Sequence, residues 1–359
     1  MNEKKFAEQF GNIDSAFVDE ALNYRPLKSK GGIHMSKKKM VSIALAAALV
    51  VAVGATTVAA TLSGLSKMKG YFDNVEDDYD NIAGMPVIED AEQYGTEVNS
   101  SAVSGTVSAQ VASVTCDEHS IYALVDITMQ GATVPDDLTE EAYFTFREWR
   151  NENHAISCRS ELISREGDVF TYVYHFAGMR KLPEEDIVIK LTDFGYYATG
   201  MMYDENRNDL FIPLAECQLD LRISASELNV QQAVNAQSPV LVRGVEMKAE
   251  LSPLGILLYG DLAEIEEKTS VYSEELDMMI SDKYFLDAKS FQFCMKDGTV
   301  VGDGENYETV YGLISAVNGW VDPDTGLKYT YIGFAAPIDV SQVECVLVHG
   351  AQFDFASAE

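Results

Sequence analysis

The sequence predicts a mainly β protein in which one transmembrane helix precedes two tandem β-sandwich-like domains. Three observations predict this fold class. Residues 41–62 contain no charged side chain. Beyond residue 105, apolar and polar residues alternate with a period of two, which is typical of half-buried strands. Four blocks of this β-rich part recur in the same order, which indicates two copies of one domain.

The apolar stretch reads VSIALAAALVVAVGATTVAATL and is continued without a charge by Ser63-Gly64-Leu65. About 20 helical residues cross the roughly 30 Å hydrocarbon core of a bilayer. We therefore predict a transmembrane helix over residues 41–65. Lysines 37 to 39 precede it, and acidic residues from Asp73 onward follow it. The positive-inside rule then predicts a single-pass protein of the cell membrane, with a cytosolic N-terminus and extracytoplasmic C-terminal domains.

Two other interpretations of this stretch remain open. It could be a cleaved signal peptide, because Val58-Ala59-Ala60 offers small residues of the kind that signal peptidases accept. However, 40 residues would precede it, and its apolar run is longer than a normal signal core. It could also be a buried helix of a soluble protein. The absence of a polar face argues against that interpretation.

Two segments precede the apolar stretch. We predict a cytosolic peptide over residues 1–27 that contains a short amphipathic helix. Its apolar stripe could bind a partner groove, and it consists of Ile13, Phe17, Ala21 and Leu22. The alternative is a disordered tail, because so short a helix is marginal alone in water. Residues 28–40 form a basic juxtamembrane linker that favours contact with anionic membrane lipid.

The part beyond the apolar stretch divides into three segments. Residues 66–104 are rich in acidic side chains and are predicted to be a stalk with little fixed structure. The first extracytoplasmic β domain is predicted over 105–226 and the second over 227–359, with an insert near 263–290. The repeated blocks pair as follows: 116–127 with 251–262, 143–149 with 291–298, 170–177 with 329–336, and 181–194 with 337–353.

The charge of the chain argues against direct nucleic-acid binding. The sequence has 26 Lys and Arg against 57 Asp and Glu, a formal net charge of −31. Residues 1–40 hold eight basic and five acidic side chains, a net of +3, so the remainder carries −34. A polyanion of this size repels phosphate backbones. The simplest interpretation is a solvated acidic surface.

No pattern of residues indicates an active site, a cofactor or a metal site. The sequence lacks the common hydrolase, metalloprotease and nucleotide-binding motifs, so we expect no enzymatic activity. The loops that begin at Asp204 and Asp322 have some calcium-ligand spacing, but we interpret them as polar turns. The five cysteines form no CxxC pair. We interpret most as buried apolar residues, and a single bridge in the exported part remains open.

Several segments resemble a group of Firmicute single-pass membrane proteins with an extracytoplasmic domain of unknown function. The likeness lies in FGNIDSAFVDEAL (10–22), the lysine run, the Ala/Val stretch and PIDVSQVECVLVHGAQF (337–353). The resemblance implies an anti-sigma-factor-like regulator whose cytosolic peptide binds an extracytoplasmic-function sigma factor. The chain departs from the zinc-containing anti-sigma class, because residues 1–40 have no Cys and only His34.

Two functional hypotheses follow. The first is a signalling protein whose outer β domains detect an extracellular ligand or stress and whose inner peptide holds a sigma factor. The second is a cell-surface ligand-binding or adhesion protein with an N-terminal membrane anchor. It is favoured by aromatic side chains that we expect to be exposed, namely Tyr196, Tyr197, Tyr203 and Trp320.

Overall fold

The structure is a computed structural model that describes residues 64–75, 94–130, 142–151, 157–182, 186–199, 201–204, 207–273, 278–281, 291–302 and 314–355. The predicted cytosolic peptide, basic linker and most of the predicted transmembrane helix lie outside these residues. Within the described ranges, no helix is both long enough and apolar enough to cross a membrane. The described chain is mainly β, as predicted, and its sheets are largely antiparallel.

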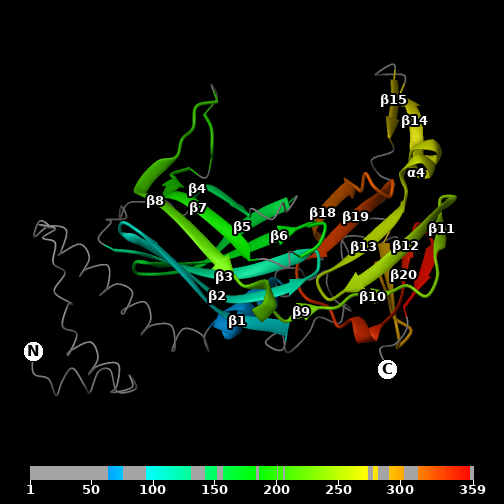
Figure 1. Cartoon of the computed structure of the whole chain (residues 1–359), viewed down its shortest axis with the longest axis horizontal. Coiled ribbons are helices and arrows are strands. Elements are labelled where there is room, and N and C mark those ends of the chain that lie inside the picture. The colour runs from blue at the N-terminus through cyan, green and yellow to red at the C-terminus, as the bar shows by residue number, and fades with distance from the viewer. Residues whose placement is uncertain are drawn as a thin grey trace, which may run out of the picture. The chain divides into compact units, whose positions relative to one another are not determined.

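The first module consists of two facing sheets (Figure 1). One has the strand order β1-β2-β3-β6-β5, and the short strand β9 pairs with β2 in parallel. The other has the order β4-β7-β8. The strands are β1 (Gly95–Ser104), β2 (Val107–Asp117), β3 (Ser120–Met129), β4 (Tyr143–Asn151), β5 (Ser157–Glu166), β6 (Val169–Ala177), β7 (Ile187–Tyr197), β8 (Ile212–Ile223) and β9 (Val230–Gln231).

The period-two pattern of β6 explains how the first core forms. Successive side chains of a strand point to opposite faces, so Phe170, Tyr172, Tyr174 and Phe176 share the face that looks toward the second sheet. All four are fully buried in one apolar cluster. Phe194 on β7 lies opposite, with its ring 5.1 Å from that of Phe170. Aromatic contacts between the sheets therefore fill the first core.

The second module repeats this architecture. One sheet has the order β10-β12-β13-β19-β18, with β11 also on β12, and the other has the order β17-β16-β20-β21. Their facing apolar residues form a second buried cluster. The strands are β10 (Val234–Asn235), β11 (Val240–Val242), β12 (Val245–Ser252), β13 (Gly255–Asp261), β16 (Phe291–Met295), β17 (Val300–Val301), β18 (Ile314–Val321), β19 (Leu327–Phe334), β20 (Val343–Val348) and β21 (Ala351–Asp354).

An insert separates β13 from β16. It contains helix α4 (Leu262–Thr269) and a hairpin of β14 (Ser270–Ser273) and β15 (Met278–Ser281). The sequence predicted an insert near 263–290. The structure places there one short helix, and the four-residue antiparallel ladder that follows it forms a hairpin. Two single 3-10 turns complete the described elements, η2 (Ala225–Glu227) and η4 (Val340–Gln342).

The repeated sequence blocks occupy equivalent places in the two modules. The order β2-β3-β6-β5 corresponds to β12-β13-β19-β18, and β4-β7-β8 corresponds to β16-β20-β21. One block alignment is nevertheless wrong by three residues. Ile121 pairs with Phe176 in the first module, whereas the equivalent Ile256 pairs with Ile332. The block alignment of 170–177 with 329–336 matches Phe176 to Ala335 instead of Ile332. Because three is an odd number of residues, this error assigns each side chain of the strand to the wrong face of the sheet.

Two predicted boundaries also need correction. Residues 64–75 form a helix and Gly95–Ser104 forms β1, so much of the predicted stalk at 66–104 is regular structure. The first sheet consequently begins before residue 105. At the other end, β9 pairs with β2 beyond the predicted boundary at 226–227. The cause in both cases is tertiary pairing, because β1 pairs with residues 107–115 of β2 and β9 pairs with Cys116 and Asp117 at the end of the same edge.

Candidate functional site

The helical residues 64–75 include the end of the charge-free stretch and present one stripe to the first module. Gly64, Met68 and Phe72 recur at intervals of four, so they share one face of the helix. Met68 and Phe72 are only 2% and 1% exposed. On another face, Lys69 and Asp73 form an ion pair at 2.6 Å in the (i, i+4) arrangement that supports a helix.

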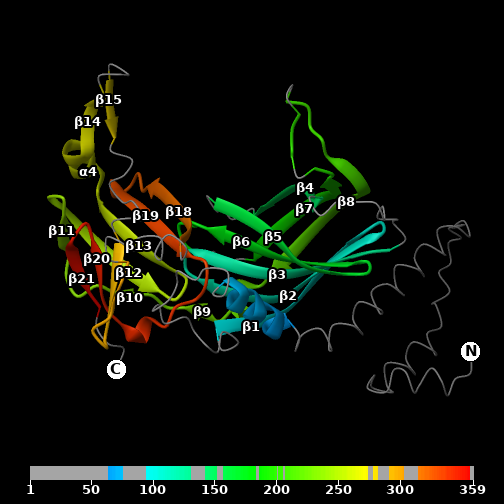
Figure 2. The same cartoon turned by 180° about the vertical axis from the view of Figure 1, so that it is seen from behind.

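This stripe packs on the outer face of the sheet β1-β2-β3-β6-β5 (Figure 2). The contacts form a third apolar cluster that joins the helix to both modules. The first module contributes Ala112, Tyr122, Leu124 and Val173, and the second contributes Leu254 and Ala336. The helix therefore touches both modules through one continuous apolar surface.

A close backbone approach holds Gly64 of the helix against the first module. A Cβ atom at Gly64 would lie 3.0 Å from the carbonyl oxygen of Ala112, which is closer than such atoms normally approach. The adjacent Ser113 hydroxyl donates a hydrogen bond of 3.1 Å to the Gly64 carbonyl oxygen. Ala112 lies at a β-bulge, because the β2–β3 register shifts between Val111 and Ser113. Bulges commonly redirect the chain at functional positions, and here the bulge contacts the helix.

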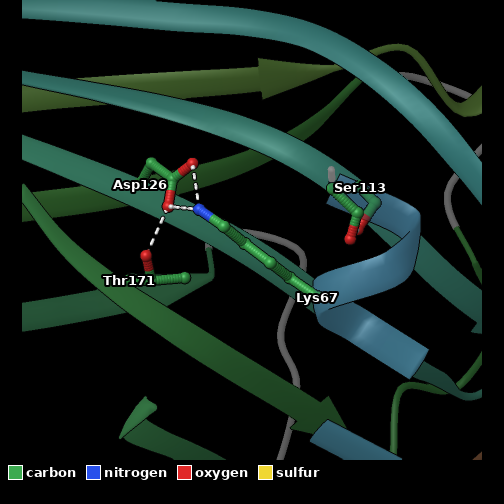
Figure 3. Close-up of polar contacts among 5 residues, drawn as sticks. Lys67, Ser113, Asp126 and Thr171 are labelled. Carbon is green, nitrogen blue, oxygen red and sulfur yellow. Dashed lines mark hydrogen bonds and ion pairs between the residues drawn. The ribbon is translucent and has the colours of Figure 1, made fainter. Parts of the chain in front are cut away.

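A polar contact lies one turn further along (Figure 3). The Lys67 ammonium lies 3.3 Å from the carboxylate of Asp126 on β3. Thr171 on β6 donates a 2.6 Å hydrogen bond to the same carboxylate. The Asp126 side chain is 16% exposed and that of Lys67 is 36% exposed. Since partly exposed ion pairs contribute little free energy, this contact orients the helix more than it holds it.

Tyr122 is the side chain that connects the helix, the first sheet and the second module. Phe72 meets its ring edge-on at 5.3 Å. His175 stacks on it with ring centroids 3.9 Å apart. Its hydroxyl donates a 2.5 Å hydrogen bond to the Phe334 carbonyl oxygen of β19. A movement of the second module against the first would therefore disturb a ring that the helix also contacts.

His175 is held in the neutral form. Its Nε2 atom lies 2.9 Å from the Ser120 hydroxyl. Burial, and secondarily the nearby Arg159 cation, lower the pKa of His175 to about 3. His175 is therefore a buried, neutral side chain of β6.

A second polar contact between the modules is built around the carboxyl group of Asp117. This group lies at the end of β2 and is 1% exposed. The Ser252 hydroxyl lies 2.5 Å from it, the Tyr331 hydroxyl 3.0 Å, and the backbone N–H of His119 donates to it at 2.7 Å. Asp117 and Ser252 are equivalent residues of the two copies in the aligned blocks 116–127 and 251–262, so the modules meet at matching positions.

This network can hold Asp117 with or without its proton. When Asp117 is ionised, Ser252 and Tyr331 both donate to it. When it is protonated, Ser252 can donate to the Gly255 carbonyl oxygen at 3.1 Å, and Tyr331 to that of Leu254 at 3.0 Å. Burial raises the pKa of Asp117, and the hydrogen bonds from Ser252 and His119 oppose that rise. The junction therefore contains a carboxyl group with two satisfied states.

A small cleft opens where the helix and the two modules meet. Its volume is about 80 Å³. Its polar and aromatic lining comes from Tyr71, Tyr122, Arg159, Glu161, His175 and Ser315. The cleft therefore lies beside the helix at residues 64–75, which contributes Tyr71 to its lining.

The structure bears on only some of the candidate residues predicted from sequence. Ile13, Phe17, Ala21 and Leu22 lie outside the described residues. The Asp204 carboxylate accepts two hydrogen bonds from Asn208, and that of Asp322 accepts one from the Asp324 N–H. Both are polar turns, as expected. Among the described residues, no three His, Cys, Asp or Glu side chains are grouped to hold a metal ion.

Two of the four aromatic residues expected to be exposed are buried. Tyr196 and Tyr197 are 6% and 5% exposed, because β7 is the central strand of its sheet. Trp320 is partly buried and stacks on Tyr329 at 5.4 Å. Tyr203 is 58% exposed, as expected. Asp117 and Tyr122 were missed, although the run VTCDEHSIY places a carboxylate between two strongly apolar segments.

Comparison with known protein families gives a match to part of the chain. Residues 35–128 match a family described as "Domain of unknown function (DUF4179)". This match includes the helix, β1, β2 and nearly all of β3. The chain is also similar to a solved structure described as the conserved domain protein from Bacillus anthracis. That similarity has 10% identity over 73% of this chain and 78% of the other, with a TM-score of 0.38. No curated protein matches the chain.

The close approach at Gly64 predicts opposite effects for two glycines of one helix. Gly64→Ala should loosen the helix, because the new Cβ meets Ala112. Gly70→Ala meets nothing within 4 Å and should stabilise by up to about 1 kcal/mol through helix propensity. Tryptic cleavage after Lys67 and Lys69 should accelerate in the first variant and slow in the second. Equal cleavage rates would contradict tight docking at Gly64.

The buried His175 predicts a loss of stability in mild acid. Its pKa in the folded protein is about 3, below that of an unfolded histidine, so the unfolded chain binds more protons as the pH falls below about 6.5. Between pH 7 and 5 this should remove about 2 kcal/mol from the free energy of unfolding. His175→Gln should lack this component of the pH dependence in chemical denaturation. Parallel curves for the two proteins would contradict a neutral, buried histidine.

Asp117 predicts a pH dependence of the opposite sign. Its raised pKa means that the folded chain binds more protons than the unfolded chain between the ordinary and the raised value. The contribution of Asp117 to the free energy of unfolding is therefore complete at low pH and is lost as the pH rises through the raised pKa. Asp117→Asn mimics the protonated form and should gain stability relative to the parent as the pH rises. A pH-independent difference between the two would show that Asp117 does not titrate in this way.

Proposed function

We propose that this chain is a membrane-anchored, anti-sigma-factor-like regulator that links an extracytoplasmic β-rich sensor to a cytosolic sigma-factor-binding peptide. The observation that carries the proposal is the position of the helix at residues 64–75. It follows directly on the apolar stretch predicted to span the membrane, and it packs against both β modules. A rearrangement of the modules would reach the membrane segment through this helix.

The contacts of the helix suit a reversible switch. They comprise two fully buried apolar side chains, a backbone approach at Gly64 and a partly exposed ion pair at Lys67. Such an interface is small enough to exchange between docked and undocked states. A stimulus that binds one state better shifts this equilibrium by its difference in affinity for the two states.

The effector end of the proposal is the cytosolic peptide. Its stripe of Ile13, Phe17, Ala21 and Leu22 would lie in an apolar groove of an extracytoplasmic-function sigma factor. A helix this short gains most of its stability from such packing. Release of the peptide or a change in its presentation would then alter how much sigma factor is free.

A second function is favoured by a different observation. The segment between β7 and β8 projects beyond its sheet (Figure 1) and exposes Met201, Met202 and Tyr203 by 59%, 48% and 58%. Clustered exposed apolar side chains mark interaction surfaces. In a cell-surface ligand-binding or adhesion protein, this projection would meet the ligand and the N-terminal segment would serve only as an anchor.

The regulator proposal predicts that residues 1–40 recover a sigma factor in a pull-down from the native host. Phe17→Asp and Leu22→Asp should each abolish recovery, because a charge would enter the apolar groove. Glu20→Gln lies off the stripe and should leave recovery unchanged. Recovery that survives both Asp substitutions would refute the helix-in-groove interaction.

Two further measurements separate the regulator from the adhesion protein. Deleting residues 1–27 from the full chain should change expression of sigma-dependent genes only if the protein is a regulator. External protease on intact cells should remove the β modules if the orientation is as proposed. Protection of the modules in intact cells, with loss after permeabilisation, would reverse the orientation.

A further inference from the structure

Two cysteines of the second module face each other across neighbouring strands. Cys294 on β16 and Cys345 on β20 are directly opposed partners in the antiparallel ladder. Both are free thiols. The thiol of Cys345 is within hydrogen-bond reach of the Cys294 thiol. The pair therefore brings together two residues that lie 51 positions apart in the sequence.

The ladder geometry suits a covalent bridge. Directly opposed residues in antiparallel strands have Cα atoms about 4.5 or 5.5 Å apart, depending on the pair type. A disulfide needs Cα atoms about 4.4–6.8 Å apart. Both pair types meet this requirement. The register also shifts between Cys294 and Met295, and this irregularity gives the backbone local freedom to adjust.

The other three cysteines provide an internal contrast. Cys116 and Cys217 are buried in the core of the first module. Cys158 is exposed on β5, and its ladder partner on β6 is Phe176. All five cysteines lie in described residues, and only Cys294 and Cys345 are ladder partners of each other.

We infer that Cys294 and Cys345 form a redox-responsive pair, which a disulfide-bearing oxidant converts to a cross-strand disulfide within the second module. The bond would fasten β16 to β20, the two central strands of their sheet. This inference is independent of the sigma-factor proposal, because it concerns the sheet β17-β16-β20-β21 of the second module and requires no cytosolic partner.

The reaction proceeds by two thiol–disulfide exchanges. Cys294 is partly exposed, so its thiolate attacks the oxidant first and forms a mixed disulfide, while one thiol of the oxidant leaves and takes up a proton. The Cys345 thiolate then attacks the Cys294 sulfur, and the second thiol of the oxidant leaves with another proton. Two cysteine thiols are oxidised, and one external disulfide is reduced to two thiols.

Nearby carboxylates restrain the second exchange. Asp354 on β21 is the ladder partner of Cys345 on its other side, and Glu344 precedes Cys345 in the chain. Burial, the neighbouring Cys294 thiol and these two negative charges raise the pKa of Cys345 to about 12. Because the thiolate is the attacking species, closure of the bridge should accelerate about tenfold per pH unit near neutrality.

The test treats the full-length chain with oxidised glutathione, blocks remaining thiols with N-ethylmaleimide and maps the peptides by mass spectrometry without reduction. We expect one linked species that joins the peptides of Cys294 and Cys345, lighter by two hydrogen atoms than the sum of the free peptides. Cys294→Ser and Cys345→Ser should each abolish it. Cys158→Ser should retain it, and in the parent chain Cys158 should carry glutathione alone.

Two outcomes would overturn the inference. One is a glutathione adduct on Cys294 that persists while Cys345 is alkylated, which would show that the pair cannot close. The other is alkylation of both residues under conditions in which Cys158 is fully modified by glutathione. Asp354→Asn keeps the shape of the side chain but removes its charge, so it should speed closure at pH 7. An unchanged or slower closure rate would contradict the proposed electrostatic restraint.

Discussion

The sheet β1-β2-β3-β6-β5 is apolar on both faces, and the arrangement of the described chain depends on this. Nearly every residue of β2 and β3 is buried. An antiparallel sheet commonly leaves one face in water, but this one needs cover on both. The inner face packs on β4, β7 and β8. The outer face is covered by the helix at residues 64–75 and by Leu254 and Ala336 of the second module.

Apolar cover alone would not fix how these parts meet, because the hydrophobic effect is not directional. The directional contacts are few and are made by fully buried groups of Asp117 and Tyr122. Asp117 accepts hydrogen bonds from Ser252 and Tyr331, and Tyr122 donates to Phe334. A buried carboxyl group or hydroxyl without a partner carries a large desolvation cost. A displaced module would leave such groups unsatisfied, so these contacts select one arrangement.

Sequence reasoning predicted the mainly β fold class because strand alternation is a local signal. Phe170, Tyr172, Tyr174 and Phe176 alternate visibly and share one face in the structure. The helix at residues 64–75 was missed because this segment carries two glycines and is stabilised by residues far along the chain. Asp117 was missed for the same reason, since Ser252 and Tyr331 are separated from it by 135 and 214 positions.

The two copies differ where the helix binds, and this difference has a physical reason. The strand ladders make Ser113 equivalent to Lys248. Ser113 pairs with Leu124, and Lys248 pairs with Tyr259, so both members of the pair shift by the same number of positions from one copy to the other. In the first copy a short hydroxyl side chain lets the Gly64 backbone approach. In the second copy a long cationic side chain occupies that position, and the adjacent strand pattern alternates between buried and exposed. A helix could not dock there without burying the Lys248 charge, which is costly without a partner. One module therefore holds a helix on its outer face, whereas the equivalent face of the other exposes Lys248 and packs Leu257 and Tyr331 against Ala177 of the first module.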